Sequence, residues 1–140
     1  MTIQKQLHPI EWKPAYQTGI DFLDQQHQKY LEIVNSLVNS INQNKCKEDI
    51  PQLFFSLVFY AEHYLISEEM SYKEYDYSDF QEHQKMHRDF AKQIIHFQKN
   101  SENGNLQENC KKMYQYLISW FENHILGEDK KAGEFIITRR

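Results

Sequence analysis

Apolar residues recur at helical spacing in four long segments of the chain. In the first segment they follow the i, i+3, i+4, i+7 pattern of an amphipathic helix for about six turns. We expect this helix near residues 21–43, and the same spacing predicts further helices near 50–73, 79–99 and 105–127. The apolar positions of the first segment are Ile20, Leu23, Tyr30, Leu31, Val34, Leu37, Val38 and Ile41.

Turn and capping residues suggest where these helices begin and end. Asp49 precedes a proline-containing first turn and is expected to cap the second helix. Ser78, with Gln81 three residues later, resembles a capping box that opens the third helix. The fourth helix is expected to stop near Gly127, which leaves residues 128–140 as a tail.

Short connections between helices of about twenty residues favour antiparallel neighbours. We therefore predict an all-α fold, an antiparallel up-down-up-down four-helix bundle, as a single domain over residues 1–140. Residues 1–19 are expected to form an irregular arm whose Trp12 and Tyr16 pack over the bundle. One alternative is a pair of helical hairpins that dimerises through an apolar face.

Composition agrees with a helical protein and excludes several functional classes. The chain has only 4 glycines and 3 prolines, too few for the turns of a β protein. Its net charge of −4 provides no basic surface for nucleic acid or an anionic membrane. The two cysteines, Cys46 and Cys110, are expected to be ordinary thiols. With no signal-peptide stretch and no membrane-length apolar run, we expect a cytoplasmic protein.

Five of the seven histidines fall on the predicted apolar faces, whereas His8 and His96 do not. In an alternating bundle, the starts of the first and third helices lie at the same end as the finishes of the second and fourth. At about 1.5 Å per residue, each of the five lies within roughly 5–15 Å of that end. They are therefore expected to meet in one layer: His27, His63, His83, His87 and His124.

A layer of buried imidazoles indicates a metal site. A purely structural bundle would leave many ring nitrogens without partners, whereas neutral imidazole is the commonest metal ligand. Glu68 follows His63, and Asp129 lies beyond Gly127, where a break in the helix could turn it inward. Glu69 is expected to stay exposed.

These residues resemble the hemerythrin family, specifically its bacterial single-domain members. The resemblance covers nearly the whole chain, and the ordered set of separations is specific. The matching segments are Trp12 and Tyr16, TGID ending at Asp21, DQQH ending at His27, His63 followed by SEEM, HQKMH from His83 to His87 with Phe90, HILGED from His124 to Asp129, and KKAG ending at Gly133.

The resemblance implies a non-haem di-iron centre, bridged by an oxo or hydroxo group and by two carboxylates. Carried over by position, it implies the metal ligands His27, His63, Glu68, His83, His87, His124 and Asp129. One coordination position would stay open for a small molecule, which in the family is O2. The implied function is reversible O2 binding for carriage, storage or delivery, without enzymatic turnover.

One position departs from the family pattern. The family has Glu four residues after the histidine of the second helix, where this chain has Ser67, so that Glu68 comes five residues after His63. On a regular helix these two side chains would lie about 140° apart. We expect a π-bulge around residues 63–68 to absorb the extra residue. The rival interpretation is a weakened or lost carboxylate bridge.

Two other interpretations of the same residues remain open. The site could serve a sensor of O2, NO or redox state, acting through a separate partner. It could also serve an iron-handling protein, although ferritin-like sites use Glu-x-x-His motifs that this chain lacks at the expected positions.

Apolar side chains around the metal site are expected to exclude water from it. The candidates are Ile20, Leu23, Leu117, Trp120 and Phe121.

Overall fold

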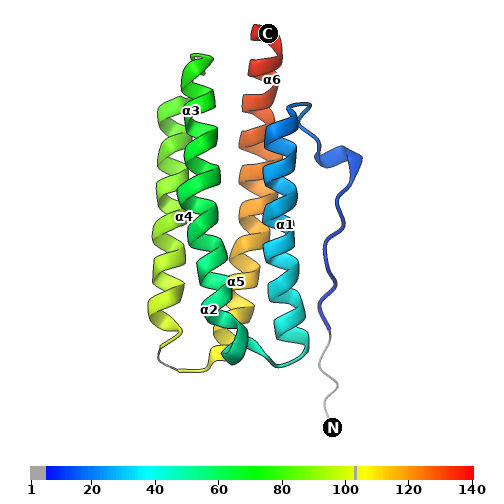
Figure 1. The fold of residues 1–140 in the computed structure, drawn as a ribbon, viewed down its shortest axis with the longest axis vertical. Helices are drawn as coiled ribbons and strands as arrows, with labels where there is room; N and C mark the ends of the chain where they lie inside the picture. Colours follow the sequence, from blue (N-terminus) through cyan, green and yellow to red (C-terminus); the bar gives the residue numbers. More distant parts are fainter. Residues whose placement is uncertain (1–5, 103) are drawn as a thin grey trace.

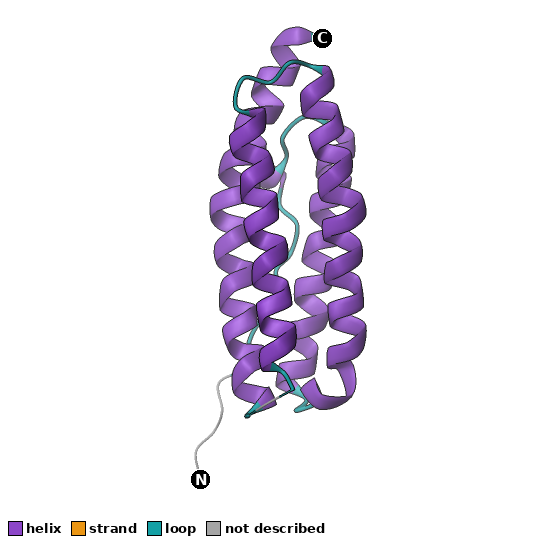
Figure 2. Cartoon of the chain, turned by 90° about the vertical axis from the view of Figure 1, so that its left-hand side faces the viewer, coloured by secondary structure: helices purple, strands orange, loops and turns teal. Residues whose placement is uncertain are grey.

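The computed structural model describes residues 6–102 and 104–140. Within this part of the chain the regular structure is entirely helical, with no strand (Figure 2). Four long rods lie side by side and are joined at alternate ends (Figure 1). This confirms the predicted all-α four-helix bundle.

Two of the rods are single α-helices and two contain a π-helical segment. The first rod is α1 (Asp21–Asn42) and the third is α4 (Phe80–Asn100). The second rod runs continuously through α2 (Cys46–Phe59), η2 (Tyr60–Leu65) and α3 (Ile66–Glu74). The fourth runs through α5 (Leu106–Trp120), η3 (Phe121–Asp129) and α6 (Lys130–Arg139).

The arm before α1 packs on the bundle, as expected. It contains one turn of 3-10 helix, η1 (Pro14–Tyr16). Trp12 meets Tyr16 edge to face at 5.6 Å between ring centroids, and Tyr16 meets Phe121 at 5.2 Å. The side-chain amide of Asn35 both donates to and accepts from the backbone of Ile10, which ties the arm to α1.

Both predicted helix caps are wrong, although the third helix starts within one residue of the expected position. The second rod begins at Cys46, and Asp49 lies inside its first turn without capping it. The Asp49 carboxylate instead accepts a hydrogen bond from the Ser40 hydroxyl at 2.6 Å. Helix α4 begins at Phe80 after Asp79 and has no side-chain cap, so the expected capping box does not form.

The predicted end of the fourth helix and the predicted tail are also wrong. The backbone stays helical through Gly127 and continues to Arg139. Ala132 and Ile136 are buried in one apolar cluster with Leu23 of α1 and with Ile20, the residue that precedes α1. Burial of this second apolar face favours continuation of the helix over a turn.

An aromatic layer fills the core beneath the buried histidines. Tyr30 packs against Tyr60, Phe90 and Trp120, and its hydroxyl donates to the Leu117 carbonyl at 2.6 Å. A buried phenol with a hydrogen-bond partner is tolerated in a core, so Tyr30 can pack among the aromatic side chains of this layer. None of the described helices combines the length and apolar character that a bilayer crossing requires.

Candidate metal centre

Five buried side chains from three rods meet near one end of the bundle. Each offers a nitrogen or carboxylate oxygen, and these atoms lie within 4.8 Å of one another. The members are Glu68, His83, His87, His124 and Asp129. His27 of the remaining rod adjoins them through Asp129, so all four rods contribute to the site.

His83 and His87 converge because they are four residues apart on regular helix α4. At that spacing two side chains share one helix face. Their ring centroids are 4.6 Å apart, and both side chains are almost fully buried. This placement agrees with the sequence prediction.

The π-helical segment η3 brings His124 and Asp129 to the same side of the fourth rod. Residues five apart on an α-helix diverge by about 140°, but a π-helix has a wider turn with i to i+5 hydrogen bonds. Both side chains are buried within η3. The predicted break at Gly127 is therefore wrong, since the helix widens there and does not end.

A second π-helical segment, η2, precedes Glu68 and has the corresponding effect on the second rod. The expected bulge exists, but it spans Tyr60–Leu65 and so begins three residues before the predicted range. Glu68 is fully buried after it, while Ser67 is exposed. The carboxylate that the resemblance assigns to the site therefore reaches the site.

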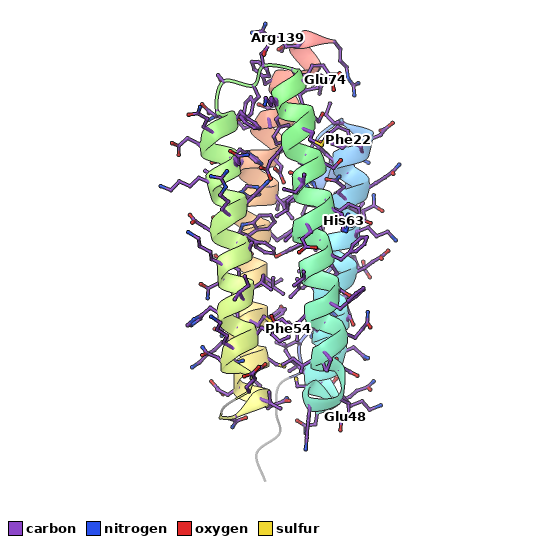
Figure 3. The ribbon with its side chains drawn as sticks, turned by 60° about the vertical axis from the view of Figure 1, so that its left-hand side comes forward. Phe22, Glu48, Phe54, His63, Glu74 and Arg139 are labelled. Atoms are coloured by element: carbon purple, nitrogen blue, oxygen red, sulfur yellow. The ribbon has the colours of Figure 1, made fainter. Side chains whose placement is uncertain are left out.

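His63 does not join the group, and the expectation that it points into the bundle is wrong. Its side chain is exposed, and its ring lies against Phe59 at 4.2 Å between centroids. Figure 3 labels it midway along its rod, between Phe54 and Glu74. The buried residues of this segment are Tyr60 and Leu65, and the Tyr60 hydroxyl has no hydrogen-bond partner.

The two oxygens of Asp129 face different imidazoles. Oδ1 lies 2.8 Å from His83 Nε2 and 3.4 Å from His124 Nε2, whereas Oδ2 accepts from His27 Nε2 at 2.9 Å. One fully buried carboxylate thus connects three imidazoles from three rods. This is the geometry expected of a carboxylate that bridges two cations.

Glu68 differs from Asp129, because only one of its oxygens faces imidazoles. Its Oε1 lies 3.7 Å from His87 Nε2 and 3.8 Å from His83 Nε2, while its Oε2 is buried without a partner. Tyr72 lies between the two carboxylates, and its hydroxyl contacts Asp129 Oδ1 at 3.1 Å and Glu68 Oε1 at 3.4 Å. The phenol therefore helps to fix the position of one carboxylate relative to the other.

The charges of these groups depend on one another. Burial alone would raise the pKa of Asp129, but the adjacent imidazoles of His124, His27 and His83 hold that pKa well below its ordinary value. Burial raises the pKa of Glu68, and the nearby Asp129 charge adds to this. Burial would lower the pKa of His83, yet Asp129 and Glu68 outweigh it and raise that pKa to about 9.

The donor set fits a metal better than it fits an internal hydrogen-bond network. His83 Nε2 lies 2.8 Å from a carboxylate oxygen but makes no hydrogen bond. The Nε2 atoms of His87 and His124 face each other at 3.2 Å. Glu68 Oε2 has no donor. A cation that accepts a lone pair from each of these atoms would satisfy them together.

Two residues around the group were not predicted. Glu69, expected to be exposed, is buried, and its Oε2 accepts from His87 Nδ1 at 3.0 Å. A carboxylate on the outer nitrogen fixes the tautomer that presents Nε2 to a metal. Tyr72 was also missed, although its position four residues after Glu68 on the same helix was a usable signal.

Replacing Glu69 with Gln is expected to weaken metal binding by about 10- to 100-fold, because the amide is a poorer acceptor for the His87 N–H. Competition with a chromophoric chelator measures this affinity. Glu62→Gln, at an exposed position of the same rod, is the matched control and should leave it unchanged. Equal affinities for the two variants would contradict the positioning role of Glu69.

Apolar residues close the site from water. The Trp120 ring stacks on the His124 ring at 4.2 Å, with an interplanar angle of 11°. All five side chains expected to line the site are buried, and they divide between two apolar clusters on either side of it. These are Ile20 and Leu23 in one cluster, and Leu117, Trp120 and Phe121 in the other.

Comparisons with known proteins agree with this site. Residues 18–136 match the family model described as the hemerythrin HHE cation binding domain. A bacteriohemerythrin of Clostridium acetobutylicum is 27% identical over 124 residues, which cover 86% of this chain and 95% of that protein. Bacteriohemerythrins of Stenotrophomonas maltophilia and Pseudomonas aeruginosa are 24% and 25% identical, over 89% and 86% of this chain and 80% and 76% of those proteins.

The matched region contains the whole cluster of buried histidines and carboxylates, from His27 to Asp129. It also contains both π-helical segments that turn Glu68 and Asp129 inward. The chain belongs to the hemerythrin family and carries a hemerythrin-like cation-binding domain with a buried His, Glu and Asp cluster.

Proposed function

We propose that this protein binds O2 reversibly at a non-haem di-iron centre and serves as a carrier or store, without catalytic turnover. The observation that carries the proposal is the buried Asp129 carboxylate, whose two oxygens face separate imidazole sets. The orphaned Glu68 Oε2 supports it, because it offers a second carboxylate to the same pair of positions.

The residues that would hold the irons are those brought together by the fold. His83, His87 and His124 would bind one iron, and His27 the other. Asp129 and Glu68 would be shared between them. When bound, two Fe(II) ions supply the electrons that allow O2 to be held reversibly.

The chain itself would keep that binding reversible. Glu69 holds His87 in the ligating tautomer, and the single hydroxyl of Tyr72 lies within hydrogen-bond distance of both carboxylates. Trp120 covers His124 and keeps water from its ring. A dry, imidazole-rich site places little negative charge around the metals, which disfavours their further oxidation.

The test is a visible spectrum of protein reduced anaerobically in the presence of excess Fe(II). Admitting O2 should produce a charge-transfer band, and removing O2 under vacuum should abolish it over repeated cycles. His124→Ala, with helical content confirmed by circular dichroism, should show no such band. Continued O2 consumption with added reductant, or bleaching that vacuum does not reverse, would contradict the carrier function.

A further inference from the structure

We infer that the two metal positions are unequal: the position at His83, His87 and His124 fills first, and the position at His27 fills second and more weakly. The inference rests on the proposed paired metal site and adds a form of regulation to it. The protein would pass through a one-metal form, and its O2 binding would then follow the supply of Fe(II).

The first position has a full set of protein ligands. Three imidazole nitrogens and one oxygen from each of two carboxylates lie within 4.8 Å of one another. His87 is already held in its ligating tautomer by Glu69, and the His124 ring is fixed by stacking on Trp120. Little reorganisation is needed for a metal to bind here, which favours high affinity.

The second position has only one imidazole. His27 Nε2 contacts Asp129 Oδ2, and the free Glu68 Oε2 is the remaining oxygen of the shared carboxylates. His63, which the resemblance assigned as a further imidazole ligand, lies outside the bundle and is not available to this position. Tyr60 faces inward from that segment instead, and a protonated phenol is a weaker ligand for a divalent cation than imidazole.

The surroundings of His63 show that it belongs to the outer surface. Its ring lies at a tilt of 32° against Phe59, which is 43% exposed. Three other exposed apolar side chains follow the same rod at helical spacing, namely Phe55, Ile66 and Met70. Turning His63 inward while Glu68 stays buried would require the π-helical segment to move along this rod, and that shift would displace the buried Tyr60 from its contact with Tyr30.

Electrostatics adds to the difference between the positions. Both metals would share Asp129 and Glu68, so the first cation already neutralises part of their negative charge. A second cation sharing these carboxylates would then meet both a weaker anionic field and direct repulsion. The position with fewer imidazoles therefore bears the larger penalty.

Anaerobic titration of the metal-free protein with Co(II), followed by its visible absorption and by equilibrium dialysis, tests the inference. We expect a tight first equivalent and a second bound about tenfold or more weakly. His27→Ala should remove only the second step, and His124→Ala should weaken the first. His63→Ala is the matched control on an exposed histidine and should change neither step, with helical content verified for every variant.

Two steps of equal affinity, or loss of the second step in His63→Ala, would overturn the inference. These outcomes are separable from failure of the proposed function. Two unequal steps without a reversible O2 band would leave the inference standing and refute O2 carriage. Two equal steps with a reversible band would do the opposite, and no metal binding at all would refute both.

Discussion

Replacing Asp129 with Ala is expected to abolish metal binding at both positions and to destabilise the metal-free protein by about 3 kcal/mol or more. The side chain is fully buried, and it contacts His27, His83 and Tyr72 through its two oxygens. Removing it leaves several buried polar groups without their partner and leaves no carboxylate between the two imidazole sets. Dialysis against Co(II) measures the first effect, and urea unfolding measures the second.

Glu134→Ala is the matched control, because this carboxylate is exposed on the same rod. It should retain both metals and shift the urea midpoint very little. Asp129→Asn adds a further test, since the amide preserves the shape but not the charge. If Asp129→Ala still bound one tight equivalent, Asp129 would be dispensable for the three-histidine position and the shared-carboxylate geometry would be wrong.

Most of the bundle could be predicted because amphipathic periodicity depends only on local spacing. The apolar positions of α1 and α4 predicted their bounds within one residue. The positions of His83 and His87 followed from their i, i+4 relation on regular helix, and bundle topology placed His27 and His124 near them. Each of these predictions needs only two facts: an α-helix turns by about 100° per residue, and successive helices of the bundle run in alternating directions.

The same rule failed where the helices widen. His63 and Glu68 are five residues apart, as are His124 and Asp129, yet the first pair is separated and the second is brought together. Within a π-segment, the side chain that turns outward depends on where the extra residue is inserted. Spacing showed that a bulge was needed in the second rod, but packing of the buried Tyr60 against Tyr30 decided its position.

Other differences reflect tertiary contacts that override local signals. Gly127 resembles a helix end, but the apolar positions Ala132 and Ile136 continue the fourth rod against the entry to α1. Glu69 was expected to be exposed to solvent, but the His87 ring of the neighbouring helix provides it with a hydrogen-bond partner. In each case the deciding residue is distant in sequence, so no local pattern could reveal it.

The metal-free protein is expected to lose stability as the pH rises from about 6.5 to 9. Burial alone would lower the pKa of His83, but Asp129 and Glu68 outweigh this effect and raise the pKa from 6.5 to about 9. A group whose pKa is higher in the folded state stabilises that state fully below its unfolded pKa, and this contribution disappears as the pH rises through the folded pKa. The difference amounts to about 3 kcal/mol of unfolding free energy.

His27 and the two carboxylates also contribute to the profile. Burial would lower the pKa of His27, but Asp129 outweighs this and raises it, so His27 acts in the same direction as His83. The raised pKa of Glu68 acts in the same direction as that of His83, but its contribution starts to be lost once the pH exceeds the ordinary value of 4.5. The lowered pKa of Asp129 acts oppositely: its contribution is present above its ordinary value of 3.8 and disappears as the pH falls. Maximum stability of the metal-free protein should therefore lie between about pH 4 and 4.5.

Urea unfolding at several pH values, with a chelator present, measures this profile. His83→Asn should flatten it between pH 6.5 and 9, whereas His8→Asn, at an exposed position of the arm, should leave it unchanged. Metal should reverse the trend, because imidazoles must lose their protons before they can ligate, so bound metal stabilises more as the pH rises. If the metal-free protein were equally stable at pH 6.5 and pH 9, the neighbouring carboxylates would not raise the pKa of His83.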